Sequence, residues 1–181
     1  YSADTLAHRL SSRGPLPASE VMAMTVELLA GLKELHRHKL MHRDIKPDNI
    51  LWLNRQAVLA DVGLVRNHAD AGACGSPGFM PEDVLAGQRK ATAADDLYAL
   101  GKVIYCALTG LGVEEFPRLP GKFSDPVAKD CFGQCVWLVP VSHRSGLPMR
   151  SGDFWLRPAM PPANEFGFGA GLPEEFSLPH F

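Results

Sequence analysis

A short polar stretch at residues 42–49, His-Arg-Asp-Ile-Lys-Pro-Asp-Asn, gathers several side chains that could do chemistry together. A further carboxylate, Asp61, follows twelve residues after Asn49. Transfer of a phosphoryl group needs a carboxylate near the attacking hydroxyl, a cation on the transferring phosphate and oxygen ligands for Mg²⁺. Asp44 can provide the carboxylate and Lys46 the cation, while Asn49 and Asp61 can hold the metal. These residue types in this order therefore indicate phosphoryl transfer.

The element before this stretch is expected to be a long helix from about Ser19 to His38. Two prolines precede it, and Ser19 is a suitable N-cap residue. Spacings of three and four residues place apolar side chains on one face of this helix, namely Val21, Met24, Leu28, Leu32 and Leu35. Such a stripe predicts a helix that packs on a core and ends close to the polar stretch.

Two short apolar runs at 50–53 and 57–60 follow the polar stretch, and three polar residues separate them. This pattern predicts the two strands of a hairpin. A second helix is expected over 94–109, with Gly110 as its C-terminal stop, and a short one near 3–10. The fold class expected from these elements is mainly α with a small β-hairpin.

The composition argues against several broad classes of protein. Of the 181 residues, 46% are hydrophobic and 21% are charged, which is enough apolar material for a buried core. The formal net charge of −2 does not suggest binding to nucleic acid or to a membrane surface. No run of about 18 apolar residues is present, so we expect no membrane-spanning segment. The four cysteines are too few for a disulfide framework, and we expect reduced thiols in a cytoplasmic protein.

Four motifs of this chain resemble those of eukaryotic-type serine/threonine protein kinases, in the same order. Residues 42–49 match the catalytic loop His-Arg-Asp-x-Lys-x-x-Asn at every fixed position. Residues 61–63, Asp-Val-Gly, are similar to Asp-Phe-Gly, with Val in place of Phe. Residues 75–82 are similar to the end of the activation segment, and 96–101 to a motif on a buried central helix. The stretch 116–120 is similar to a loop common in bacterial members.

The resemblance implies a nucleotide, a metal and a substrate class. Asp44 would be the catalytic base or the carboxylate that orients the acceptor hydroxyl, and Lys46 would steady the γ-phosphate of ATP. Leu51 would pack below the adenine ring, while Asn49 and Asp61 would hold Mg²⁺. A lysine two residues after the catalytic Asp is the serine/threonine-kinase arrangement, so the acceptor would be a Ser or Thr hydroxyl of a protein substrate.

The resemblance also implies structural or regulatory roles for further residues. Ser76 would bridge the catalytic carboxylate and lysine, and Asp96 would accept backbone donors from the catalytic loop. Glu82 and Arg157 would form a buried ion pair, and Arg43 would pair with a phosphorylated activation segment. The full set comprises His42, Arg43, Gly63, Ser76, Glu82, Asp96 and Arg157.

The domain organisation expected from the resemblance is a C-terminal kinase lobe without its small lobe. Residues 1–110 would form the core of the lobe, 111–158 its loosely matching end, and 159–181 an unassigned flexible tail. Only 41 residues precede His42, and no glycine-rich loop lies among them. We therefore expect a fragment or truncated form that is inactive alone, with an N-terminal lobe elsewhere in the parent protein.

Two other functions stay open at the level of the sequence. A non-catalytic kinase-like module could bind a partner through the surface of the large lobe, although the four proposed catalytic and metal-binding side chains are intact. A small-molecule phosphotransferase could share the fold, although such enzymes usually show His-Gly-Asp and lack the pattern at 75–82. Nucleotide binding tests the first alternative, and a comparison of protein with small-molecule acceptors tests the second.

Overall fold

The computed structural model describes residues 4–61, 66–67, 75–121, 126, 128 and 129. Its helices are α1 (Leu6–Arg13), α2 (Ala18–Arg37), α3 (Glu82–Leu85) and α4 (Ala93–Thr109), with short 3-10 helices η1 (Pro47–Asn49) and η4 (Val113–Glu115). Its strands are β1 (Leu40–Met41), β2 (Ile50–Leu53), β3 (Gln56–Leu59) and β4 (Arg66–Asn67). The predicted Gly63 and Arg157 lie outside the described residues, as does most of the predicted 111–158 segment and all of 159–181.

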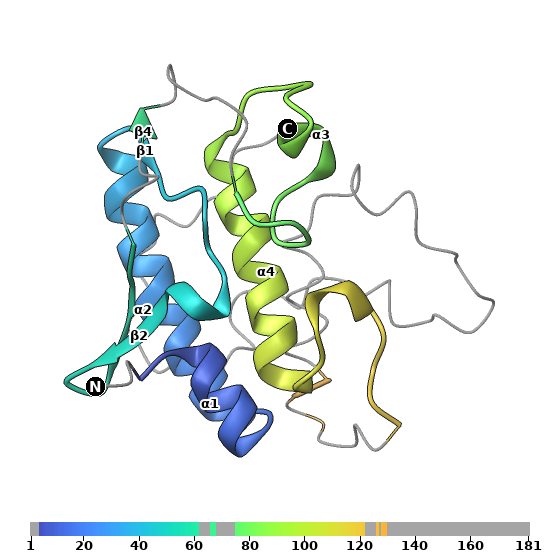
Figure 1. Ribbon diagram of the computed structural model, residues 1–181. Helices are drawn as coiled ribbons and strands as arrows, with labels where there is room; N and C mark the ends of the chain where they lie inside the picture. The colour runs from blue at the N-terminus through green and yellow to red at the C-terminus, as the bar shows by residue number, and fades with distance from the viewer. Residues whose placement is uncertain (1–3, 62–65, 68–74, 122–125, 127, 130–181) are drawn as a thin grey trace. The chain divides into compact units, whose positions relative to one another are not determined.

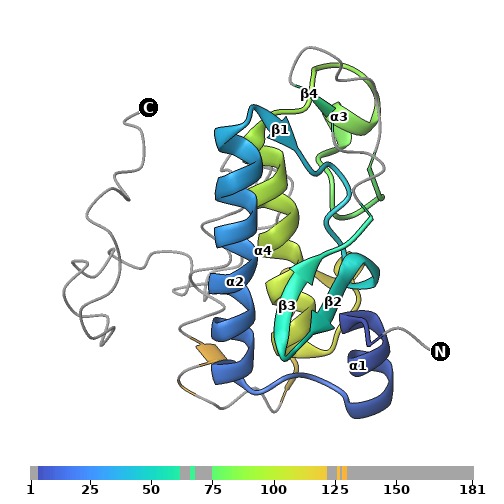
Figure 2. The same ribbon diagram turned by 90° about the vertical axis from the view of Figure 1, so that its left-hand side faces the viewer.

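The two long helices, α2 and α4, lie side by side and carry most of the buried apolar side chains (Figures 1 and 2). The predicted stripe of α2 is buried, except that Leu35 is only half-buried. Helix α4 is buried continuously from Tyr98 to Thr109 and stops at Gly110, whose φ of 69° is left-handed. Both predicted helices are thus present, each within one residue of its expected bounds.

The start of α2 differs from the prediction. Its N-cap is Pro17, whose carbonyl oxygen accepts hydrogen bonds from the N–H groups of Glu20 and Val21 at 2.9 and 3.0 Å. Proline is tolerated there because the first helical turn does not need its missing N–H group. The prediction of Ser19 as N-cap is therefore wrong, since Ser19 lies inside the first turn.

The predicted hairpin is formed by β2 and β3, which pair antiparallel with Leu51 opposite Val58 and Trp52 opposite Ala57. Strand β3 begins one residue earlier than predicted. The connecting residues Asn54 and Arg55 have φ values of 50° and 69°, and two left-handed residues make the tight turn that matches the twist of a hairpin. A two-residue turn rather than a three-residue loop accounts for the shift.

Both edges of this hairpin are tied to the rest of the fold. The N–H group of Trp52 donates to the carbonyl oxygen of Asp4 at 3.1 Å. On the other edge, the N–H group of Ala57 donates to the carboxylate of Glu27 at 2.7 Å, and β3 lies along α2 (Figure 2). The hairpin is therefore fixed between the segment before α1 and the middle of α2.

A second, shorter sheet pairs β1 with β4, in which Met41 lies opposite Arg66. The sequence did not predict this sheet, because each strand has only two residues and carries no alternating pattern. It places the start of the catalytic-loop stretch beside the segment that follows Asp61.

Among the described residues, no helix is both long enough and apolar enough to span a bilayer.

Helix α4 also buries a charged side chain, Lys102, which is 9% exposed. Its ammonium nitrogen lies 3.8 Å from the ring centre of Phe116 and 5.5 Å from that of Tyr98, and it forms no ion pair within the described part of the chain. Burial lowers the pKa of Lys102 to about 8. The aromatic rings thus compensate only part of the cost of removing the charge from water.

Replacing this lysine should stabilise the protein at neutral pH. The folded state disfavours the protonated amine, so Lys102→Met should raise the free energy of unfolding at pH 7 by about 1–3 kcal/mol, at about 1.4 kcal/mol per pKa unit. Above pH 8 the unfolded chain binds more protons at this site than the folded one, so the wild type gains stability and the advantage of the variant shrinks. Urea unfolding at pH 7 and pH 9 measures this, with the exposed Lys33→Met as control; an advantage that is equal at both pH values would contradict it.

Candidate active site

The catalytic-loop stretch is held by the carboxylate of Asp96, which is 1% exposed near the start of α4. The N–H group of His42 donates to its Oδ2 atom at 3.0 Å, and the N–H group of Arg43 donates to Oδ1 at 2.8 Å. Arg43 has a φ of 71°, a conformation that costs an L-residue about 1–3 kcal/mol. The two hydrogen bonds hold the chain in this turn just before Asp44.

Two histidines add to this support. The Nε2 atom of His36, on α2, lies 2.8 Å from Oδ2 of Asp96, so α2 also contributes to holding the carboxylate. The Nε2 atom of His42 lies 3.0 Å from the carbonyl oxygen of Ala60, which places Nε2–H as the donor. His42 is fully buried and its Nδ1 atom finds no partner among the described residues. These contacts are structural, and they tie the catalytic loop to the residue before Asp61.

Asp44, Lys46 and Ser76 form a closed set of hydrogen bonds. The ammonium group of Lys46 lies 2.8 Å from Oδ2 of Asp44 and donates to Oγ of Ser76 at 2.9 Å. The hydroxyl group of Ser76 donates to Oδ1 of Asp44 at 2.7 Å. Burial alone would raise the pKa of Asp44, but the hydrogen bonds from Lys46 and Ser76 outweigh it, so the pKa lies below its usual value. The carboxylate is therefore ionised at neutral pH.

Asn49 is oriented by the same carboxylate. Its side-chain NH₂ group donates to the carbonyl oxygen of Asp44 at 2.8 Å and to Oδ2 of Asp44 at 2.9 Å. Since both donors are used in this way, its amide oxygen is the group that could serve as a metal ligand. The N–H group of Ala60 donates to the backbone oxygen of Asn49 at 2.8 Å, which brings the chain just before Asp61 beside Asn49.

Asp61 is exposed and follows β3 with a φ of 57°. The structure shows no cluster of three or more His, Cys, Asp or Glu side chains among its described residues that could hold a metal alone. An Asn–Asp pair fits Mg²⁺ that keeps water or phosphate oxygens in its other positions. Leu51, which lies between Asn49 and Asp61 in the sequence, is half-buried in β2.

The stretch 75–82 approaches the catalytic loop at Gly75. Its φ is 123°, and a Cβ atom there would lie 3.0 Å from the carbonyl oxygen of Arg43, so only glycine fits without displacement. Next to it, Met80 packs with Met41, Val84 and Ala91 in a buried cluster. The glycine and the cluster together place Ser76 against Asp44. Glu82 is exposed at the start of α3, and its predicted partner lies outside the described residues.

The protein kinase domain family matches this chain over residues 1–117, which include all of the site. The chain belongs to the protein kinase family. This confirms the resemblance seen in the sequence, and kinases of this family generally use ATP and Mg²⁺.

Three relatives illustrate the similarity. Serine/threonine-protein kinase PknA of Nostoc sp. is 35% identical over 130 residues, covering 65% of this chain and 23% of the relative. The carbon catabolite-derepressing protein kinase of Candida albicans is 32% identical over 136 residues, covering 70% and 22%. The inactive serine/threonine-protein kinase PLK5 of Mus musculus is 35% identical over 115 residues, covering 60% and 19%. The chain therefore spans only about a fifth to a quarter of the length of these kinases.

Sequence reasoning missed several residues that support this candidate site. Glu27 and His36 both lie on α2 and reach β3 and Asp96, respectively. Asp95, beside Asp96, accepts hydrogen bonds from the N–H and hydroxyl groups of Thr92, which forms a capping box. The Thr-x-x-Asp spacing before an apolar helix is a signal that could have revealed Asp95. Glu27 and His36 carry no such local signal.

The hydroxyl group of Ser76 should set the acidity of Asp44. Ser76→Ala removes one donor to the carboxylate, so the pKa of Asp44 should rise toward its usual value. Carboxyl-carbon NMR titration of the folded protein measures this, and Ser76→Thr, which keeps the hydroxyl group, serves as the matched control. If Asp44 titrates identically in wild type and Ser76→Ala, the hydrogen bond does not influence its ionisation.

Proposed function

We propose that this protein transfers the γ-phosphoryl group of ATP to Ser or Thr hydroxyl groups of a protein substrate. The observation that carries the proposal is the hydrogen-bonded set of Asp44, Lys46 and Ser76, in which one carboxylate faces both a cation and a hydroxyl donor. Phosphoryl transfer depends mostly on positioning and on charge stabilisation, and these three side chains provide both.

Asp44 can accept one more hydroxyl donor. A carboxylate has about four lone-pair sites, and Oδ2 already accepts from Lys46 and Asn49, whereas Oδ1 accepts from Ser76. Oδ1 accepts from no second donor among the residues that the structure describes, and this position would take the hydroxyl group of the substrate. Because the pKa of Asp44 is lowered, the carboxylate would be ionised and would orient this hydroxyl group as a hydrogen-bond acceptor.

The negative charge of the nucleotide phosphates would be offset by Lys46 and by a Mg²⁺ ion held by Asn49 and Asp61. The ammonium group of Lys46 would lie against the transferring phosphoryl group, where it offsets negative charge. The amide oxygen of Asn49 and the carboxylate of Asp61 would hold Mg²⁺, and Leu51 would contact the adenine ring. When bound, Mg·ATP would supply the phosphoryl group, and its Mg²⁺ would offset the negative charge of the phosphate oxygens.

Loss of the proposed catalytic carboxylate should affect turnover rather than nucleotide binding. In the protein expressed from its complete gene, Asp44→Asn should lower kcat by about 10²-fold or more with little change in the KM for ATP. Asp61→Asn should instead raise the Mg²⁺ and ATP concentrations needed for activity. Phosphorylation of Ser- and Thr-containing peptides measures both effects. Asp48→Asn, an exposed neighbour in the same loop, is the matched control; unchanged turnover in Asp44→Asn would refute the assignment.

We also propose that these residues form the large lobe of the kinase and that a small lobe completes the nucleotide site. A kinase small lobe covers the phosphates with a glycine-rich loop and a lysine held by a glutamate. The lysines that precede the catalytic loop here, Lys33 and Lys39, are exposed on α2 and just after it. Neither lysine takes the place of the phosphate-binding lysine that a small lobe provides. This supports the proposal that a small lobe completes the nucleotide site.

The 181-residue chain alone should therefore bind Mg·ATP weakly. Half of the groups that position the phosphates would be missing, and their loss should cost more than that of one side chain. Calorimetric titration of the purified chain should give no binding in the micromolar range. Micromolar binding together with transfer to a Ser or Thr peptide would show that the large-lobe residues suffice.

A further inference from the structure

Arg89 joins two carboxylates that belong to different helices. Its Nε atom donates to Oδ2 of Asp83, on α3, at 2.7 Å. Its Nη1 and Nη2 atoms donate to the two carboxylate oxygens of Asp95, on α4, at 2.8 and 2.7 Å. All three nitrogens of the guanidinium group are thus used, and one rigid fork connects the end of the activation segment to the start of α4.

On the α4 side the carboxylate of Asp95 is buried and hydrogen-bonded through both oxygens, whereas the side chain of Arg89 is half-buried. The side chain of Asp95 is 4% exposed and also accepts hydrogen bonds from the N–H and hydroxyl groups of Thr92. Burial alone would raise the pKa of Asp95, but the hydrogen bonds from Arg89 and Thr92 bring it below the usual value. A surface ion pair contributes little, whereas removal of one partner from a buried pair leaves an uncompensated charge. The buried charge of Asp95 is therefore compensated mainly by the guanidinium group of Arg89.

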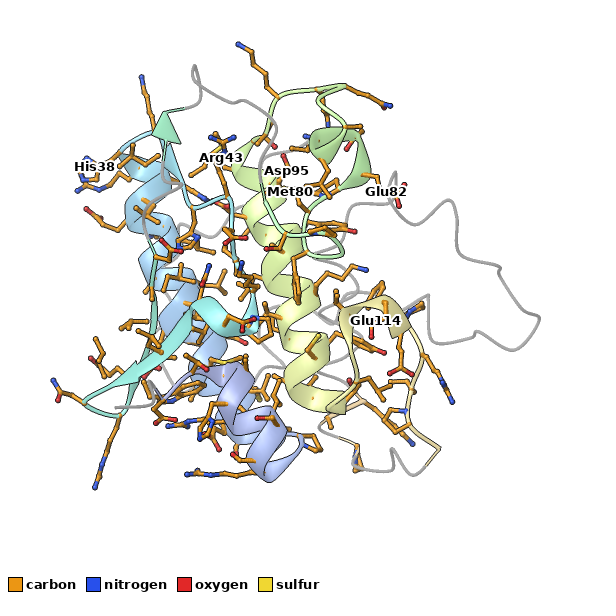
Figure 3. All side chains as sticks on the ribbon, viewed as in Figure 1. His38, Arg43, Met80, Glu82, Asp95 and Glu114 are labelled. Atoms are coloured by element: carbon orange, nitrogen blue, oxygen red, sulfur yellow. The ribbon has the colours of Figure 1, made fainter. Side chains whose placement is uncertain are left out.

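The residue after Asp95 holds the catalytic loop. Asp96 accepts hydrogen bonds from the N–H groups of His42 and Arg43, and Asp44 is the next residue after Arg43. Figure 3 shows Asp95 at the N-terminal end of α4, close to α3, which carries Glu82. Because Asp95 and Asp96 share the first turn of one helix, a movement of this turn changes both sets of contacts together.

We propose that Arg89 is a positioning residue that couples the placement of α3 to the geometry of the catalytic loop through the first turn of α4. A shift of α3 moves Asp83 and, through Arg89, Asp95. Because Asp96 lies in the same helical turn as Asp95, its hydrogen bonds to the backbone of His42 and Arg43 change as well. A lysine could not replace this arginine, because its single ammonium group cannot serve both oxygens of Asp95 and Asp83 together. Only the expected effect of Arg89 on the rate of phosphoryl transfer rests on the proposed kinase function. The structural coupling does not.

Amide hydrogen exchange tests the coupling without nucleotide. Arg89→Met should raise the exchange rates of the His42 and Arg43 amides by about tenfold or more, while the amides of Leu28 and Leu32 in α2 keep theirs. Arg89→Lys should give a smaller increase at the same two amides. The matched control is Arg118→Met, which removes an arginine that is 74% exposed and paired with Glu115; it should change neither pair of amides.

A second variant guards against simple loss of folding. Asp83→Ala removes only the α3 side of the bridge and leaves Arg89 on Asp95, so it should affect the His42 and Arg43 amides in the same direction. Unchanged exchange at these amides in Arg89→Met overturns the proposal. A uniform rise over all amides in both Arg89→Met and Asp83→Ala also overturns it, because Arg89 would then be a general stabiliser.

The rate measurement distinguishes positioning from nucleotide binding. In the active protein, Arg89→Lys should lower kcat by about tenfold while the KM for ATP stays within twofold, since the catalytic loop rather than the adenine contact is disturbed. An equal change in both constants would argue against a role at the loop. If the wild type transfers no phosphate at all, the proposed function fails, and the exchange experiment still decides the coupling.

Discussion

Two backbone N–H groups in the interior, those of His42 and Arg43, depend on the carboxylate of Asp96. An unpaired buried donor costs about 1–3 kcal/mol, and Arg43 also adopts a left-handed conformation. Without the carboxylate, the turn before Asp44 would have neither its hydrogen bonds nor a reason to keep this conformation. The direction of Asp44, and with it the contacts to Lys46 and Asn49, follows from this one interaction.

The hairpin provides the second fixed part of the site. Asn49 precedes β2 and Asp61 follows β3 by two residues, so the pairing of the strands brings both chain ends together. The backbone hydrogen bond from Ala60 to Asn49 continues this pairing toward the site. A change in strand register would separate the two residues proposed to hold Mg²⁺. The hairpin thus matters for the proposed metal site as well as for the proposed adenine contact.

The residues of the catalytic loop could be predicted from the sequence because their chemistry is local. Spacing alone brings Asp44, Lys46 and Asn49 into one short loop, and apolar periodicity predicts α2 and α4. The contact of Glu27 with β3 could not be predicted, since it joins residues 30 positions apart whose approach depends on how α2 packs. The choice of Asp95 rather than another acid as the partner of Arg89 depends in the same way on the position of α3.

The ties on both sides of the hairpin have a consequence for association between chains. Strand edges offer unpaired N–H and carbonyl groups that can recruit a strand from another molecule, and a two-stranded hairpin has two such edges. Here the outward N–H group of Trp52 is taken by the Asp4 carbonyl and that of Ala57 by a negatively charged carboxylate. A foreign strand would have to displace both, and would meet the charge of Glu27 on one side. The contacts that fix the hairpin in its register thereby also protect it against edge-to-edge aggregation.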